Sequence, residues 1–195
     1  MKSTRGMIRV LAVYALIVPA AGLVQTTWPA GLTIMGTIPD LLLVLAILSG
    51  YLFGRRDGLV IGLAAGFIRD ALAGRSMGLG MLLLMYAGLL ASVTFRKLFR
   101  RNIPLGLVLI ILTTVLYHML ITLMTFIMPV IPDVAYSLPV LLEHMWKILP
   151  GSVLGNVLAG IPMILLLYFA GPYRRGSRNV NDEQTIAGES LWQTK

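Results

Sequence analysis

Charged side chains inside otherwise apolar stretches are the residues of this sequence whose chemistry stands out. Asp40 follows a long uncharged run, and the adjacent Arg69 and Asp70 close a glycine-rich apolar segment. An ionisable group within a membrane helix is costly, so it is a candidate functional residue by default. Two acids and one base suit ion pairing, helix capping or the binding of a polar ligand.

Asp40 has three interpretations. The residues Thr37-Ile38-Pro39-Asp40 have the form of a capping box, with proline in the first turn. A pair with Arg69 fits as well, because both lie about 6 to 8 Å from the ends of antiparallel helices. Direct contact with a ligand is the third. We predict a structural charge cluster of Asp40, Arg69 and Asp70; the alternative for Arg69 is snorkelling to the outer headgroups.

Small residues four apart form a second pattern. Gly58, Gly62 and Gly66 lie on one helix face and would let a neighbouring helix approach closely. The partner is either a helix of this chain or a helix of another protein. Gly151 and Gly155 repeat the pattern more weakly.

A polar stripe follows a later apolar segment: Thr114, His118, Thr122 and Thr125 share one helix face. A proton or ion path would use such a stripe, with His118 titrating. Hydrogen bonds between helices are the alternative. We favour the hydrogen bonds, because no carboxylate lies near His118 in the sequence.

Catalytic patterns are absent from the sequence. It has no cysteine, its two histidines stand apart, and it has no glycine-rich phosphate loop. We therefore expect no catalytic residue, no cofactor, no metal and no enzymatic activity.

The composition places these residues in a membrane. Of the 195 residues, 57% are hydrophobic and 12% are charged, about half the charged share of a soluble domain. This excludes a soluble enzyme, a disordered chain and a disulfide scaffold. The net charge of +8 fits basic residues that flank membrane helices and no nucleic-acid partner.

The spacing of the charges predicts an all-α polytopic membrane protein with one domain over residues 1–175. A membrane-spanning helix needs about 20 apolar residues. Residues 140–149 are expected to form a separate interfacial helix outside the membrane, with a Glu143–Lys147 pair. Residues 176–195 are polar and predicted to be a disordered cytoplasmic tail. The six expected helices are residues 8–27, 36–53, 58–74, 77–95, 103–128 and 150–171.

Lysine and arginine predict the orientation. Thirteen of the 16 basic residues fall on one side of the six-helix plan, so both termini are expected to be cytoplasmic. The alternative is a signal peptide cleaved after Ala20-Ala21-Gly22, which would leave five helices.

The order of these features resembles the MreD family of rod-shape-determining membrane proteins. Residues 39–43 open the second helix, a basic turn at 55–57 precedes the glycine-rich helix, and residues 66–80 carry an Asp-x-x-small-Gly pattern. The resemblance is clearest over residues 36–95. Arg69 stands where the family has an apolar residue.

The resemblance implies a non-enzymatic, multi-pass scaffold in the bacterial inner membrane. It implies binding to MreC and, through it, to the glycan polymerase RodA and the transpeptidase PBP2, with a link to MreB filaments on the cytoplasmic side and contact with membrane lipid. The family fold also resembles the S-component of energy-coupling-factor transporters. The alternative function is therefore a vitamin-binding transporter subunit, and a proton-coupled transporter is a more distant one.

Overall fold

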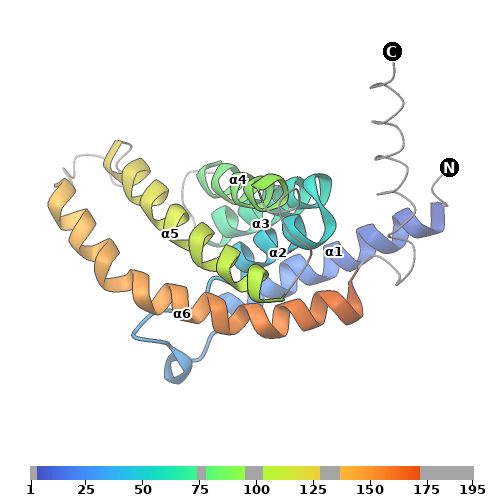
Figure 1. The fold of residues 1–195 in the computed structure, drawn as a ribbon, viewed down its shortest axis with the longest axis horizontal. Coiled ribbons are helices and arrows are strands. Elements are labelled where there is room, and N and C mark those ends of the chain that lie inside the picture. Colours follow the sequence, from blue (N-terminus) through green and yellow to red (C-terminus); the bar gives the residue numbers. More distant parts are fainter. Residues whose placement is uncertain (1–3, 74–77, 95–102, 128–136, 172–195) are drawn as a thin grey trace, which may run out of the picture.

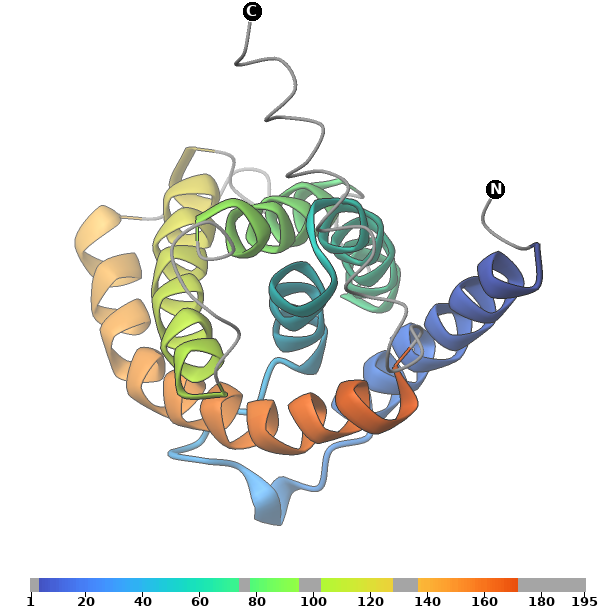
Figure 2. The same ribbon diagram turned by 45° about the vertical axis from the view of Figure 1, so that its right-hand side comes forward.

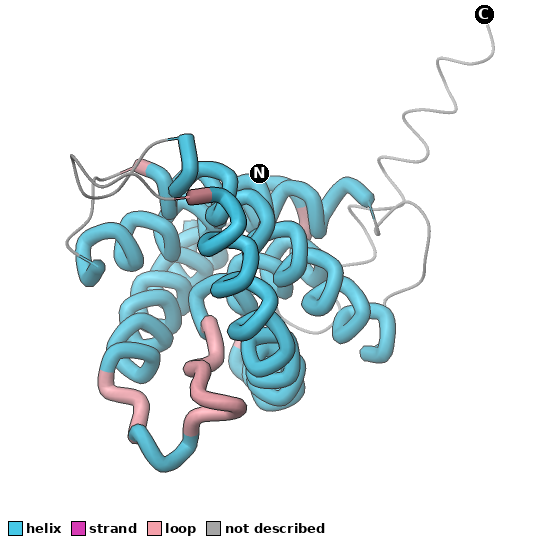
Figure 3. The backbone as a smooth tube through the Cα atoms, turned by 90° about the vertical axis from the view of Figure 1, so that its left-hand side faces the viewer, coloured by secondary structure: helices cyan, strands magenta, loops and turns pink. Residues whose placement is uncertain are grey.

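The computed structural model describes residues 4–73, 78–94, 103–127 and 137–171. Within these ranges the regular structure is helical, apart from an isolated bridge between Ile34 and Thr37 (Figures 1 and 3). The elements in chain order are α1 (Thr4–Thr26), the 3-10 helix η1 (Ala30–Leu32), α2 (Leu41–Phe53), α3 (Arg55–Ala73), α4 (Leu79–Thr94), α5 (Ile103–Ile127) and α6 (Leu138–Ala170).

Helix α2 lies at the centre of the molecule. Every residue from Leu41 to Tyr51 is buried, as expected for a helix that is apolar on all sides. Helix α2 contacts each of the other five α-helices, and Figure 2 shows them arranged around it. The first residues of α2 are therefore enclosed by protein, and their backbone N–H groups need partners from neighbouring helices.

The start of α2 differs from the expectation. The sequence predicts a helix from residue 36, whereas the structure begins it at Leu41. Residues 34–37 form a tight turn in which the backbones of Ile34 and Thr37 exchange two hydrogen bonds, of 2.8 and 3.0 Å. Gly36 has a φ of 77°, which a helix does not allow.

The last helix also differs from the expectation. Residues 140–149 are not a separate interfacial helix but the first part of α6, which continues through Pro150. The buried residues Met145, Leu149, Ser152 and Asn156 are spaced four, three and four apart, so one packed stripe crosses the proline. Packing along this stripe offsets the loss of the backbone hydrogen bond that Pro150 cannot donate. The expected Glu143–Lys147 pair is formed, with 2.8 Å between Oε1 and Nζ.

Two helices have the length and composition of a membrane span: α5 over Pro104–Ile127 and α6 over Leu138–Phe169. Shorter apolar helices cover Val10–Thr26, Leu41–Phe53 and Leu79–Val93. The prediction of an all-helical fold with six α-helices is confirmed within the described ranges. Residues 176–195, predicted to be a disordered tail, lie outside them.

Candidate functional site

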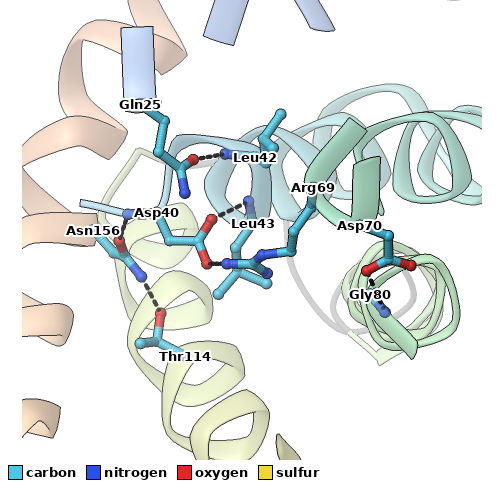
Figure 4. A network of polar contacts seen from close by, with 9 residues as sticks. All are labelled: Gln25, Asp40, Leu42, Leu43, Arg69, Asp70, Gly80, Thr114 and Asn156. Atoms are coloured by element: carbon cyan, nitrogen blue, oxygen red, sulfur yellow. Dashed lines mark hydrogen bonds and ion pairs between the residues drawn. The ribbon is translucent and has the colours of Figure 1, made fainter. Parts of the chain in front are cut away.

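Asp40 and Arg69 meet at the start of α2 and form an ion pair (Figure 4). Asp40 is the N-cap of α2, and its Oδ1 accepts a hydrogen bond of 3.0 Å from the backbone N–H of Leu43. The Arg69 guanidinium donates to the other carboxylate oxygen. It also lies over the ring of Tyr117 from α5, 4.9 Å from the centroid, a distance at which cation and ring attract. The pair therefore joins α2, α3 and α5.

The capping role of Asp40 differs from the expected one. The capping-box interpretation makes Thr37 the N-cap, but the Thr37 hydroxyl donates to the carbonyl oxygen of Ile34 at 2.8 Å. Asp40 caps the helix itself, because the turn at residues 34–37 ends before the helix begins. Capping and ion pairing were alternatives for Asp40; its two carboxylate oxygens perform one each.

Neighbouring helices supply partners for the other N–H groups at this helix end. Asn156 of α6 accepts from the backbone N–H of Asp40 at 2.7 Å, and Gln25 of α1 accepts from that of Leu42 at 3.2 Å. The amide nitrogen of Asn156 donates to the Thr114 hydroxyl of α5 at 3.1 Å. Asn156 is fully buried, so its loss would leave buried polar groups unpaired.

We call these residues the polar network: Gln25, Asp40, Arg69, Tyr117, Thr114 and Asn156. It links α1, α2, α3, α5 and α6 around the buried end of α2, and Figure 4 shows all of its members except Tyr117. The sequence prediction missed Gln25, Tyr117 and Asn156. The signal for Gln25 and Asn156 was a side-chain amide inside an expected membrane helix, where polar groups are costly unless they are bonded.

Asp70 lies apart from this network and caps α4. Its carboxylate accepts hydrogen bonds from the backbone N–H groups of Gly78, Gly80 and Met81, at 2.8, 3.0 and 3.2 Å. The predicted cluster required Arg69 to bond both carboxylates. In the structure the Arg69 guanidinium bonds Asp40, whereas the Asp70 carboxylate bonds the backbone at the start of α4. Consecutive helical residues point about 100° apart, so Arg69 faces α2 while Asp70 faces α4.

Two glycines explain the spacing that follows Asp70. Gly78 has a φ of 123°, in a region that other residues rarely adopt. A Cβ atom on Gly80 would lie 2.1 Å from Oδ1 of Asp70. The approach of the carboxylate to the end of α4 thus requires glycine at residue 80.

The predicted glycine face packs against α4 of the same chain. A Cβ atom on Gly58 or Gly62 would lie 2.5 Å from the carbonyl oxygen of Gly88 or Leu84, and one on Gly66 would lie 2.3 Å from the Cα atom of Met81. Backbone approaches backbone along the whole face. The sequence left open whether this face packs against a helix of the same chain or of another protein. In the structure it packs against α4 of the same chain.

The predicted polar stripe of α5 divides into separate contacts. Thr114 is buried and belongs to the polar network, whereas the Thr125 hydroxyl donates to the carbonyl oxygen of Ile121 in its own helix at 2.8 Å. His118 packs edge-on against Tyr117, with 5.8 Å between ring centroids. Thr122, one turn further along α5, is half-buried. Among the described residues, the hydrogen bonds of Thr114 and Thr125 go to different partners and do not join the stripe into one chain.

The comparison with protein families decides the identity. The model of the MreD family, described as rod shape-determining protein MreD, matches residues 4–169. The chain belongs to the MreD family. The match covers the six α-helices, apart from the last residue of α6, and every residue of the polar network. It gives this MreD-family protein a role in rod shape determination. Neither a curated protein nor a solved structure matches the chain.

The polar groups of this protein are arranged to hold helices together. Within the described ranges, no three His, Cys, Asp or Glu side chains gather as metal ligands would. The Asp40 and Asp70 carboxylates accept hydrogen bonds from backbone N–H groups at the starts of α2 and α4, which otherwise have no partner within their own helix.

Proposed function

We propose that this MreD-family protein is a non-enzymatic scaffold of the cell-elongation complex in the bacterial inner membrane. In this proposal it binds MreC and supports the RodA–PBP2 peptidoglycan synthase, with MreB filaments on the cytoplasmic side. The family match over residues 4–169 is the observation that carries the proposal. The polar network and the Asp70 cap support it, because the carboxylates of Asp40 and Asp70 are engaged in capping helices.

The proposed topology has six membrane-spanning helices with both termini in the cytoplasm. The distribution of basic residues supports this orientation, and the apolar character of α1, α2, α4, α5 and α6 supports the spans. Helix α3 carries Arg69 and Asp70 near its end, where pairing and capping lower the cost of placing charge in a membrane.

Cell shape under controlled expression tests the proposed function. In a rod-shaped host whose only MreD-family protein is this chain, we expect rods while it is expressed and rounded cells after expression stops. Gly62→Leu should fail to keep cells rod-shaped, because its Cβ atom meets the α4 backbone. Gly31→Leu is the matched control, since a Cβ atom at Gly31 meets nothing within 4 Å. Rods that persist without the protein would contradict the proposal.

A further inference from the structure

A groove of about 460 Å³ opens between α4 and α5, beside the first residue of α3. Its walls are mainly apolar and aromatic side chains, with Ala87 and Tyr86 at the α4 side and Tyr117 at the α5 side. Helices α4 and α5 touch over little of their length, whereas α4 packs closely on α3. The groove is therefore a gap in the helix ring, lined by apolar side chains.

Two polar groups interrupt this apolar lining. Arg55 is exposed at one end of the groove and forms no ion pair within the described part of the chain. The Thr113 hydroxyl, further along, is buried and has no hydrogen-bond partner among the described residues. A buried hydroxyl without a partner is costly. Because the Thr113 hydroxyl is closed off from the groove, the occupant is defined by the apolar lining and by Arg55: it has an apolar body and an anionic group at one end.

The size of the groove selects between a lipid chain and a protein helix. The α4 residues that line it run from Leu83 to Val93, about 15 Å of helix. A volume of about 460 Å³ over that length leaves a mean cross-section of roughly 30 Å². A helix about 10 Å across has a cross-section of roughly 80 Å², so a helix would lie across the opening of the groove and leave its interior unfilled. A single hydrocarbon chain fits.

We propose that this groove binds one acyl chain of an anionic phospholipid. The Arg55 guanidinium pairs with the lipid phosphate, and the acyl chain lies along the apolar walls. In the proposed topology Arg55 lies in a cytoplasmic turn, so the lipid comes from the inner leaflet, where basic residues meet anionic headgroups. This site goes beyond the scaffold function and uses no residue of the polar network except Tyr117, whose ring forms part of the wall.

Native mass spectrometry of the purified full chain, titrated with phosphatidylglycerol or with phosphatidylcholine, tests the proposal. We expect phosphatidylglycerol to bind more tightly than phosphatidylcholine. Arg55→Gln should weaken phosphatidylglycerol binding about fivefold, the contribution of about 1 kcal/mol expected of one basic residue, and weaken phosphatidylcholine binding less, because the choline cation offsets the charge of its phosphate. Arg56→Gln is the matched control, because Arg56 is exposed but does not line the groove.

A second variant addresses the chain-binding part of the groove. Ala87→Leu places a larger side chain in the wall and should weaken binding of both lipids, with the thermal unfolding temperature as the check on folding. Equal effects of Arg55→Gln and Arg56→Gln, or undiminished lipid binding by a folded Ala87→Leu protein, would overturn the proposal. Loss of a co-purifying membrane protein from Ala87→Leu without a change in lipid binding would identify a protein contact and overturn it as well.

Discussion

Removal of the Asp70 carboxylate should destabilise the protein through the end of α4. Asp70→Ala leaves three backbone N–H groups, those of Gly78, Gly80 and Met81, without their acceptor. An unsatisfied buried donor costs about 1–3 kcal/mol, and the carboxylate also interacts favourably with the helix dipole. Since Gly78 and Met81 are only partly buried, water offsets part of the loss, and we estimate a total of about 2–4 kcal/mol.

Asp70→Asn should cost less, about 1–2 kcal/mol. The amide keeps one oxygen, which can serve the N–H groups that now share Oδ2, but its NH₂ group then faces the N–H of Gly80. Two donors facing each other repel. The order of stability should therefore be wild type, Asp70→Asn and Asp70→Ala.

Thermal unfolding of the purified protein in one detergent measures this order. For a chain of this size, 1 kcal/mol shifts the midpoint by about 2–4 °C, so Asp70→Ala should lose roughly 10 °C. Glu143→Gln is the matched control, because it also converts a carboxylate to an amide but removes only an exposed i, i+4 pair, worth about 0.2–0.5 kcal/mol. The cap is refuted if Asp70→Asn and Asp70→Ala shift the midpoint no more than Glu143→Gln.

Three further predictions concern other parts of the molecule. Arg69→Ala should lower the unfolding temperature, by the equivalent of about 2–4 kcal/mol, because the partly buried Asp40 carboxylate loses its cation; adding Asp40→Asn should recover part of the loss, and no recovery would mean that the pair is not coupled. Gly62→Leu should reduce the amount of folded protein in membranes, measured by fluorescence size-exclusion chromatography, whereas Gly31→Leu should match wild type; equal yields would mean that the α3–α4 contact tolerates a side chain. A cysteine at Ser137 should react with an impermeant reagent added outside the cell, and one in the C-terminal tail should not; the reverse pattern would contradict the proposed topology.

Helix number and type follow from the sequence because they depend on local composition. Uncharged stretches separated by charges predict six helices, and the structure has six within the described ranges. The ends of the helices depend on more distant contacts. Helix α2 begins at Leu41 because Asn156 and Gln25, far away in the sequence, satisfy its first N–H groups. Helix α6 continues through Pro150 because its packed stripe extends on both sides of the proline.

The candidate site shows the same division. Residue type and depth predict that Asp40 and Arg69 are neighbours, and the structure pairs them. The direction of Asp70 was not predictable from depth alone, because one residue along a helix turns the side chain toward a different neighbour. Its partner is a helix end that only the glycines at 78 and 80 bring within reach. Gly62 predicts close packing from its own spacing, but the identity of the partner helix is a property of the whole fold.

Affinity purification of the full chain from bacterial membranes, followed by mass spectrometry, tests the scaffold function most directly. The proposal predicts recovery of MreC together with RodA and PBP2 from detergent-solubilised membranes, and loss of these proteins from a Gly62→Leu sample. Recovery of the energising module of a vitamin transporter, without cell-wall proteins, would contradict the proposal and favour a small-molecule-binding subunit.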